Sequence, residues 1–218
     1  MTQSRDAYHH GDLRNALVAS AVRLIETSGT SSFSLREAAR DVGVSANAAY
    51  RHFDDKSALI AAVAADGFLR LAKRMQRAMA SAAARHGDEP ASIARFKAAG
   101  GAYVEFATDH PEIFRVMFGE SGAACRDATG DEQDETPWTL LGQALDALVQ
   151  DGFLHPDRRP GAELKAWTVV HGFASLSLDG LAAAPTRRDR AIALASLLDF
   201  AVIGLCGDVR FTSKDEPT

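Results

Sequence analysis

Two short segments of helical character meet at a single glycine, Gly43, and no other feature of the sequence limits the possible folds as strongly. Ser34 followed three residues later by Glu37 has the spacing of a capping box, which predicts a short helix over about residues 35–41. Gly43 can take the left-handed conformation that ends a helix, and Ser45 can cap a further helix of under ten residues. We therefore predict two short helices separated by a tight turn.

Longer helices are predicted on both sides of this turn. Asp12 can cap a first helix that ends near Gly29, and Asp54 with Asp55 opens a long fourth helix. Apolar residues recur in both at spacings of three and four, as expected for helices with one face on a core. These residues are Leu13, Leu17, Ala21, Leu24 and Ile25 in the first helix, and Leu59, Val63, Phe68, Leu71 and Met75 in the fourth.

The whole chain is predicted to be all-α. Its 218 residues can bury a substantial core, and 46% of them are hydrophobic, with Ala and Leu abundant and few Tyr, Thr or Pro, a mixture that favours helix over sheet. Residues 119–137 are acidic and lack apolar periodicity, which predicts a solvated loop. Further helices are expected at about residues 90–108, 111–118, 137–151, 161–183 and 187–206.

Charge is distributed unevenly along the chain. Residues 1–85 carry 12 Lys and Arg against 8 Asp and Glu, whereas residues 86–218 carry 12 against 21, so the overall charge of −5 hides a basic N-terminal part and an acidic remainder. A basic module on an acidic body is typical of a DNA-binding head joined to a domain that does not bind DNA.

The block SLREAARDVGVSANAAYRHFDDKSAL, residues 34–59, resembles the DNA-binding head of the TetR family. The likeness lies in the capped short helix and in Gly43-Val44-Ser45, Tyr50, His52-Phe53, Lys56 and Leu59. Upstream, residues 8–14 (YHHGDLR) look like the entry of one TetR subgroup. The body resembles that subgroup through His110-Pro111, Phe114-Arg115, Trp167, His171 and Gly172, so the resemblance covers about residues 8–206.

This resemblance implies a helix-turn-helix head over residues 1–54 and a helical ligand-binding and dimerisation bundle over residues 55–218. The expected protein is a homodimeric transcription regulator on double-stranded operator DNA, a repressor released by a small, largely apolar effector. Two alternatives stay open. A helical protein-interaction adaptor without DNA binding would explain the helices, and an activator would share the same binding parts.

The second short helix is predicted to enter the major groove with its leading turn, because a helix of this size fits between the phosphate walls. Ala46 and Ala48 let it approach closely, and Asn47 can make a bidentate contact with adenine. Lys56 opposes the dipole of the fourth helix, a conflict that a bound phosphate would relieve. The resemblance places further DNA contacts nearby, and the full set is Ser34, Arg36, Ser45, Ala46, Asn47, Ala48, Tyr50, Arg51, His52 and Lys56.

An effector pocket is predicted from apolar and aromatic residues on the body helices, although the same side chains could simply fill the core. The candidates are Phe106, Phe114, Met117, Phe118, Trp138, Leu141 and His171. On one helix, Trp167 and His171 can stack while Gly172 admits a neighbouring backbone. Here a packed helix with one hydrogen-bonded histidine competes with a pocket-lining role for His171.

Residues 191–206 are apolar nearly all round, which in a water-soluble chain indicates burial on two sides. One side can pack on the same subunit and the other needs a partner. In the TetR family the last two helices of each subunit form a four-helix dimer interface. Asp199 within this run is expected to be paired or at the rim, because an unpaired buried carboxylate is costly.

Several other classes of function are disfavoured. No nucleophile with a base, carboxylate pair or glycine-rich phosphate loop stands at a usable spacing, so we expect no enzyme and no cofactor. His9 and His10 point to different faces, and Cys125 and Cys206 are far apart, so no metal site is expected. No segment reaches the roughly 20 apolar residues of a membrane span, which predicts a cytoplasmic protein.

Overall fold

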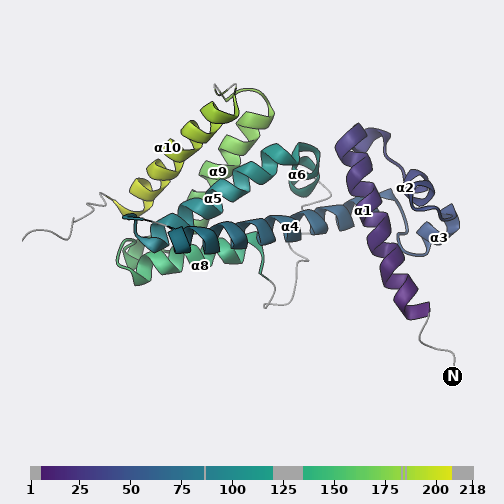
Figure 1. Ribbon diagram of the computed structural model, residues 1–218, viewed down its shortest axis with the longest axis horizontal. Coiled ribbons are helices and arrows are strands. Elements are labelled where there is room, and N and C mark those ends of the chain that lie inside the picture. Colours follow the sequence, from purple (N-terminus) through teal and green to yellow (C-terminus); the bar gives the residue numbers. More distant parts are fainter. Residues whose placement is uncertain (1–5, 86, 120–134, 183, 185, 208–218) are drawn as a thin grey trace, which may run out of the picture. The chain divides into compact units, whose positions relative to one another are not determined.

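The computed structural model describes residues 6–85, 87–119, 135–182, 184 and 186–207, and within these ranges every regular element is helical (Figure 1). The all-α prediction is therefore confirmed. The α-helices are α1 (Asp6–Ser32), α2 (Leu35–Val42), α3 (Ala46–Tyr50), α4 (Lys56–Arg85), α5 (Ala91–Asp109), α6 (Pro111–Phe118), α8 (Pro137–Gln150), α9 (Ala162–Leu178) and α10 (Arg187–Cys206), with a 3₁₀ turn, η1 (Pro156–Arg158). Most of the predicted acidic loop, residues 120–134, lies outside the described ranges.

The helices form two compact units. Unit 1 contains α1, α2, α3, the part of α4 up to Leu71, and α6, whereas unit 2 contains α4 from Ala72 onward together with α5, α8, α9 and α10. Helix α6 thus belongs with helices far upstream of it in sequence. The functional boundary predicted at residue 54 stays a prediction.

The helix ends in unit 1 follow mainly from capping side chains. Ser34 caps α2 by accepting the Glu37 N–H at 3.2 Å, and Gly43 ends this helix in the left-handed conformation with φ +79°. Gly29, with φ +72°, interrupts α1 where the sequence predicted its end. The start of α1 was predicted too late at Asp12: no proline interrupts residues 7–11, and the helical backbone begins at Asp6.

Helix α6 packs closely on α4 and α1 within unit 1. A Cβ atom added to Gly67 of α4 would lie 2.7 Å from Sδ of Met117, so glycine permits this approach. The rings of Phe68 and Phe118 meet edge to face at 5.5 Å. Pro111 begins α6, as predicted from its fixed φ.

Unit 2 packs α5, α9 and α10 around small side chains. A Cβ on Gly100 of α5 would lie 2.6 Å from Cδ2 of Leu198 on α10 and 3.1 Å from Cγ1 of Val170 on α9. Helix α10 begins at Arg187 as predicted, and Thr186 forms a full capping box with Asp189.

Two features of unit 2 differ from the sequence prediction. Helix α9 ends at Leu178 rather than at residue 183, because Gly180 takes φ +70° and Leu181 beyond it is 72% exposed, without the burial that would prolong the helix. The turn η1 was not predicted, since three residues carry no periodicity. No helix within the described ranges is both long and apolar enough to cross a membrane.

Candidate nucleic-acid interface

The leading turn of α3 presents small and polar side chains at the surface of unit 1. Ser45 caps the helix by accepting the Ala48 N–H at 3.2 Å, and Ala49 anchors it in the core with 0% exposure. Asn47 is exposed, and Ala46 beside it is half-buried. The short side chains around Asn47 leave its amide group able to reach a base edge without steric hindrance from neighbours on the same turn.

The remaining predicted DNA contacts flank this turn. Tyr50 is 44% exposed, Arg51 is exposed, and His52 is half-buried with contacts to other groups. On α2, Arg36 is exposed, whereas the Ser34 hydroxyl already caps the helix and donates to the Glu37 carboxylate at 3.0 Å. The hydroxyl of Ser34 is therefore engaged inside unit 1.

Lys56 makes contacts that its position in the sequence did not predict. Its Nζ donates to the carbonyl oxygen of Thr30 at 2.7 Å and lies 5.7 Å from the ring centroid of Phe33. The Thr30 carbonyl thus provides part of the compensation for a cation at the start of α4. An ammonium group has three N–H donors, so this bond is compatible with a phosphate contact.

A polar cluster joins α1 to α2 within unit 1. Asp41 accepts hydrogen bonds from the Ser20 hydroxyl and from Arg23, both at 2.6 Å. The hydrogen bond from Ser20, followed by that from Arg23, holds the pKa of the Asp41 carboxyl below its usual range. The sequence offered no signal for this cluster, because its members lie about twenty residues apart.

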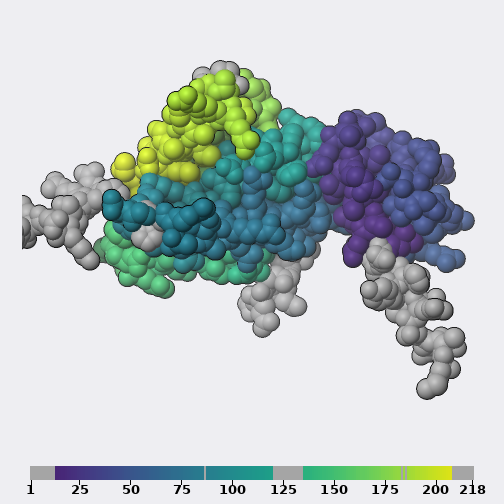
Figure 2. Space-filling view, in the orientation of Figure 1, coloured from purple at the N-terminus to yellow at the C-terminus, as the bar shows by residue number. Residues whose placement is uncertain are grey.

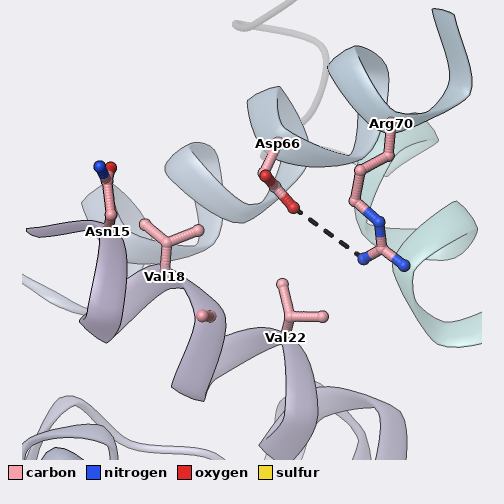
Figure 3. Close-up of a pocket in the computed structure, with 6 residues that line it drawn as sticks. Asn15, Val18, Val22, Asp66 and Arg70 are labelled. Carbon is pink, nitrogen blue, oxygen red and sulfur yellow. Dashed lines mark ion pairs between the residues drawn. The ribbon is translucent and has the colours of Figure 1, made fainter. Parts of the chain in front are cut away.

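A shallow groove of about 250 Å³ lies between α1 and α4 in unit 1 (Figure 3). Val18 and Val22 contribute its apolar part, and the Asp66–Arg70 ion pair at 3.9 Å lies on the α4 side. A guanidinium nitrogen of Arg70 also lies 3.3 Å from Nε2 of His110, whose Nδ1 lies 2.8 Å from Oε1 of Glu26. None of the predicted DNA contacts lines this groove.

The predicted effector residues are divided between the two units. In unit 1, Phe114 and Met117 are buried, and the rings of Phe114 and Phe118 lie 4.7 Å apart. In unit 2, Phe106 is buried, Leu141 and His171 are half-buried, and Trp138 is 51% exposed. Within unit 2, His171 and Trp138 join a cluster of rings with Trp167 and Tyr103.

Tyr103 was missed by the sequence reasoning. Its hydroxyl oxygen lies 2.8 Å from Nδ1 of His171 and 3.1 Å from Nε1 of Trp167. His171 of α9 is therefore a hydrogen-bonded histidine, one of the two interpretations considered for it from the sequence. A tyrosine hydroxyl on the buried face of the α5 segment could have indicated a buried hydrogen bond, but the sequence does not show which residue it contacts.

Two family models match the chain. The model of bacterial regulatory proteins of the tetR family matches residues 17–63, and that of the tetracyclin repressor-like C-terminal domain matches residues 96–200. The chain belongs to the TetR family. It is a DNA-binding transcription regulator, in a family whose members are not enzymes.

Solved structures share this all-helical TetR fold. A protein of unknown function from Rhodococcus sp. RHA1 is 30% identical, with a TM-score of 0.71, and the match covers 93% of this chain and 100% of that one. A TetR-family transcriptional regulator from Pectobacterium atrosepticum is 20% identical, with a TM-score of 0.67 and coverage of 94% and 100%. A TetR variant from Acinetobacter baumannii AYE in complex with minocycline is 21% identical, with a TM-score of 0.58 and coverage of 87% and 94%. None of the curated proteins compared with the chain matches it.

The tetR-family match runs from within α1 to within α4 and includes every predicted DNA contact, from Ser34 to Lys56. The C-terminal match begins within α5 at residue 96 and ends within α10 at residue 200, so it includes the ring cluster of Tyr103, Trp167 and His171. The TetR family assignment thus rests on both parts of the chain.

Proposed function

We propose that this TetR-family regulator is a homodimeric repressor that reads its operator with the leading turn of α3 and releases it when a small apolar effector binds unit 2. The observation that carries the DNA-reading role is the exposed Asn47 on a helix capped by Ser45 and anchored by buried Ala49. A side chain held in this way can meet a base edge with little loss of backbone freedom on binding.

The other candidate side chains would hold α3 in register. Tyr50 and Arg51 are exposed one turn beyond Asn47, where a phenol and a guanidinium can reach phosphate oxygens. Ser45 and Ser34 cap α3 and α2, so their roles are to fix the helix starts near the DNA. His52, Arg36 and Lys56 complete the proposed positioning contacts, and Ala46 and Ala48 permit close approach.

A gel shift with genomic fragments, followed by the isolated operator, tests DNA reading. We expect Asn47→Ala to weaken operator binding about tenfold, as one bidentate base contact contributes about 1–3 kcal/mol. Asn15→Ala, at an exposed position of α1, is the matched control and should bind as wild type. If the wild-type protein shifts no genomic fragment, the adaptor alternative is favoured. If Asn47→Ala binds the operator as tightly as the wild-type protein does, Asn47 is not the base reader.

The dimer is proposed from apolar side chains left uncovered on α9 and α10, which lie side by side (Figure 1). Large hydrophobic residues on these two helices have exposed fractions from 48% to 64%: Leu164, Leu176, Ile192, Phe200 and Ile203. Much of α10 forms the surface of unit 2 in Figure 2. A surface this apolar is typical of a protein interface.

Two glycines favour a second copy of the chain as the occupant of this face. A Cβ added to Gly172 of α9 or Gly204 of α10 would meet no atom within 4 Å among the described residues. Glycine inside a helix costs about 0.5–1 kcal/mol relative to alanine, and packing among the described residues of one subunit does not require it at either position. Two copies of the α9–α10 pair related by a two-fold axis would bring backbones together there and cover the apolar face.

Effector release is proposed from the C-terminal match and from the minocycline complex of the TetR variant. A ligand releases DNA only if it binds better to a conformation in which the two DNA-binding heads of the dimer do not fit the operator. The coupling between ligand binding and operator binding is reciprocal, because both are binding equilibria of the same protein. Compounds that raise the melting temperature of the protein should therefore lower its affinity for the operator. The operator should lower the affinity for each of these compounds by the same factor. Compounds that stabilise the protein without changing its affinity for DNA would contradict effector release. A reporter gene behind the regulated promoter distinguishes a repressor from an activator.

A further inference from the structure

Arg14 of α1 keeps its positive charge at the surface of unit 1 without an acidic partner among the described residues. The side chain is exposed, and its guanidinium carbon Cζ lies 4.6 Å from the ring centroid of Phe53, which is only 3% exposed. No hydrogen bond or ion pair joins this guanidinium to another residue in the described ranges. Asp55, two residues after Phe53, instead accepts the Ala58 N–H at 2.7 Å.

Arg23 on the same helix shows the more usual arrangement of a surface arginine. Its guanidinium donates to the Asp41 carboxylate at 2.6 Å, so its charge is compensated within unit 1. Nine residues separate Arg14 from Arg23, which is about two and a half helical turns, so the two side chains leave α1 on opposite sides. The charge of Arg14 is therefore not part of the polar cluster that joins α1 to α2.

The contact with Phe53 makes Arg14 well suited to bind an anion. A cation–π contact uses the positive charge of a guanidinium and none of its N–H donors, so these donors remain able to bind an acceptor. The contact also restrains a long side chain, which lowers the conformational entropy that binding would otherwise cost. A restrained guanidinium fits a phosphate group, because two of its N–H groups can donate to two phosphate oxygens at once.

Phe53 places this guanidinium beside the segment that carries several proposed DNA contacts. The segment joins α3 to α4, with exposed Arg51 at its start and Lys56 at the first residue of α4. The Phe53 N–H donates to the Ala49 carbonyl oxygen at 3.1 Å, which ties the segment to the end of α3. Arg14, although far upstream in sequence, therefore lies next to the proposed positioning contacts.

We propose that Arg14 binds a backbone phosphate of the operator through its N–H donors, adding a DNA contact from α1 to those around α3. The inference rests on the operator reading by α3 proposed above. A phosphate contact carries no base information, so Arg14 strengthens binding to any DNA duplex and does not select among sequences.

The salt dependence of binding tests the phosphate contact, with gel shifts on the isolated operator and on a scrambled duplex of the same length. Arg14→Gln should weaken both complexes at least about fivefold, and by the same factor, because it removes a charge-assisted hydrogen bond to the backbone. The slope of log K against log salt should flatten by about one unit for each subunit bound. Arg14→Lys keeps the charge and should keep the slope.

Two further variants serve as controls. Arg14→Met removes the charge but keeps an apolar stem beside Phe53, so it should reproduce the effect of Arg14→Gln on the slope even if the glutamine variant does not fold. Arg23→Gln removes a positive charge from the opposite side of α1 and should leave the slope unchanged.

A wild-type salt slope in the neutral Arg14 variants would overturn the proposal. Weaker binding to the operator alone, without a change of slope, would also overturn it, because Arg14 would then only support α3 through Phe53. The scrambled duplex separates this inference from the proposed function. If Asn47→Ala leaves operator binding unchanged, base reading by α3 fails, while the Arg14 contact is still measured on the scrambled DNA.

Discussion

At the scale of single residues, Lys56 has both a structural contact and a proposed DNA contact. Lys56→Met should lose the hydrogen bond to Thr30, lowering the free energy of unfolding by about 1 kcal/mol, while keeping an apolar stem near Phe33. If the ammonium also binds a phosphate, the slope of log K against log salt should flatten by about one unit. Thermal unfolding and salt-dependent gel shifts measure the two effects.

Lys73→Met is the matched control for this prediction, because Lys73 is an exposed lysine further along α4. It should change neither the unfolding free energy nor the salt slope appreciably. A Lys56→Met variant that is less stable but keeps the wild-type salt slope would restrict Lys56 to its structural contact with Thr30.

Asp41 gives a second residue-scale prediction, on the dependence of stability on pH. Its pKa is lowered in the folded state by Ser20 and then by Arg23, so its contribution is present in full above the ordinary value of 3.8 and is lost as pH falls toward the lowered value. Asp41→Asn should therefore flatten the acid side of the stability profile below about pH 4. Ser20→Ala should flatten it in the same direction, and an unchanged profile in both variants would contradict this assignment.

At the scale of helices, the approach of α4 to α6 depends on Gly67. Alanine normally stabilises a helix relative to glycine, but a Cβ here would lie 2.7 Å from Sδ of Met117, which is fully buried. We expect Gly67→Ala to lower the free energy of unfolding by about 1–3 kcal/mol through overpacking, as measured by urea denaturation.

Gly101→Ala in α5 is the matched control for this effect, because its added Cβ would meet no described atom within 4 Å. It should be neutral or stabilising by up to about 1 kcal/mol. Equal effects of the two substitutions would mean that α6 does not pack on α4 as the structure has it. The double variant Gly67→Ala with Met117→Ala should be more stable than the sum of the single effects predicts, because shortening Met117 makes room for the added methyl group and that group fills part of the space left.

At the scale of the whole molecule, the proposed dimer predicts that exposed apolar residues of α10 matter for assembly and not for folding. Ile203→Glu should raise the dimer dissociation constant at least about tenfold in sedimentation experiments, because a charge would be buried at the interface. Gly172→Ala should also weaken the dimer while leaving the subunit as stable as wild type or more so.

Leu69→Glu tests whether this response is specific to the α9–α10 face, since Leu69 of α4 is 51% exposed but lies in unit 1. It should leave the dimer intact. A monomeric wild-type protein at micromolar concentration would exclude the dimer. If the dimer stands, the operator should carry two half-sites about one DNA turn apart, roughly 34–36 Å, or a multiple of it.

The sequence by itself determined the features that depend on contacts within one or two turns of helix. Ser34, Ser45 and Gly43 set the limits of the two short helices, and Pro111 began α6, because capping and φ preferences act through neighbouring residues. The family head was recognisable for the same reason, since its residues follow one another closely along the chain.

Only the tertiary structure decided which distant residues meet. It packed α6 against α4 at Gly67, divided the predicted effector residues between two units, and bonded Tyr103 to His171 across 68 positions of sequence. Lys56 likewise found the Thr30 carbonyl 26 positions away. Helical periodicity indicates that a side chain is buried but not against what, because the partner is set by how whole helices pack.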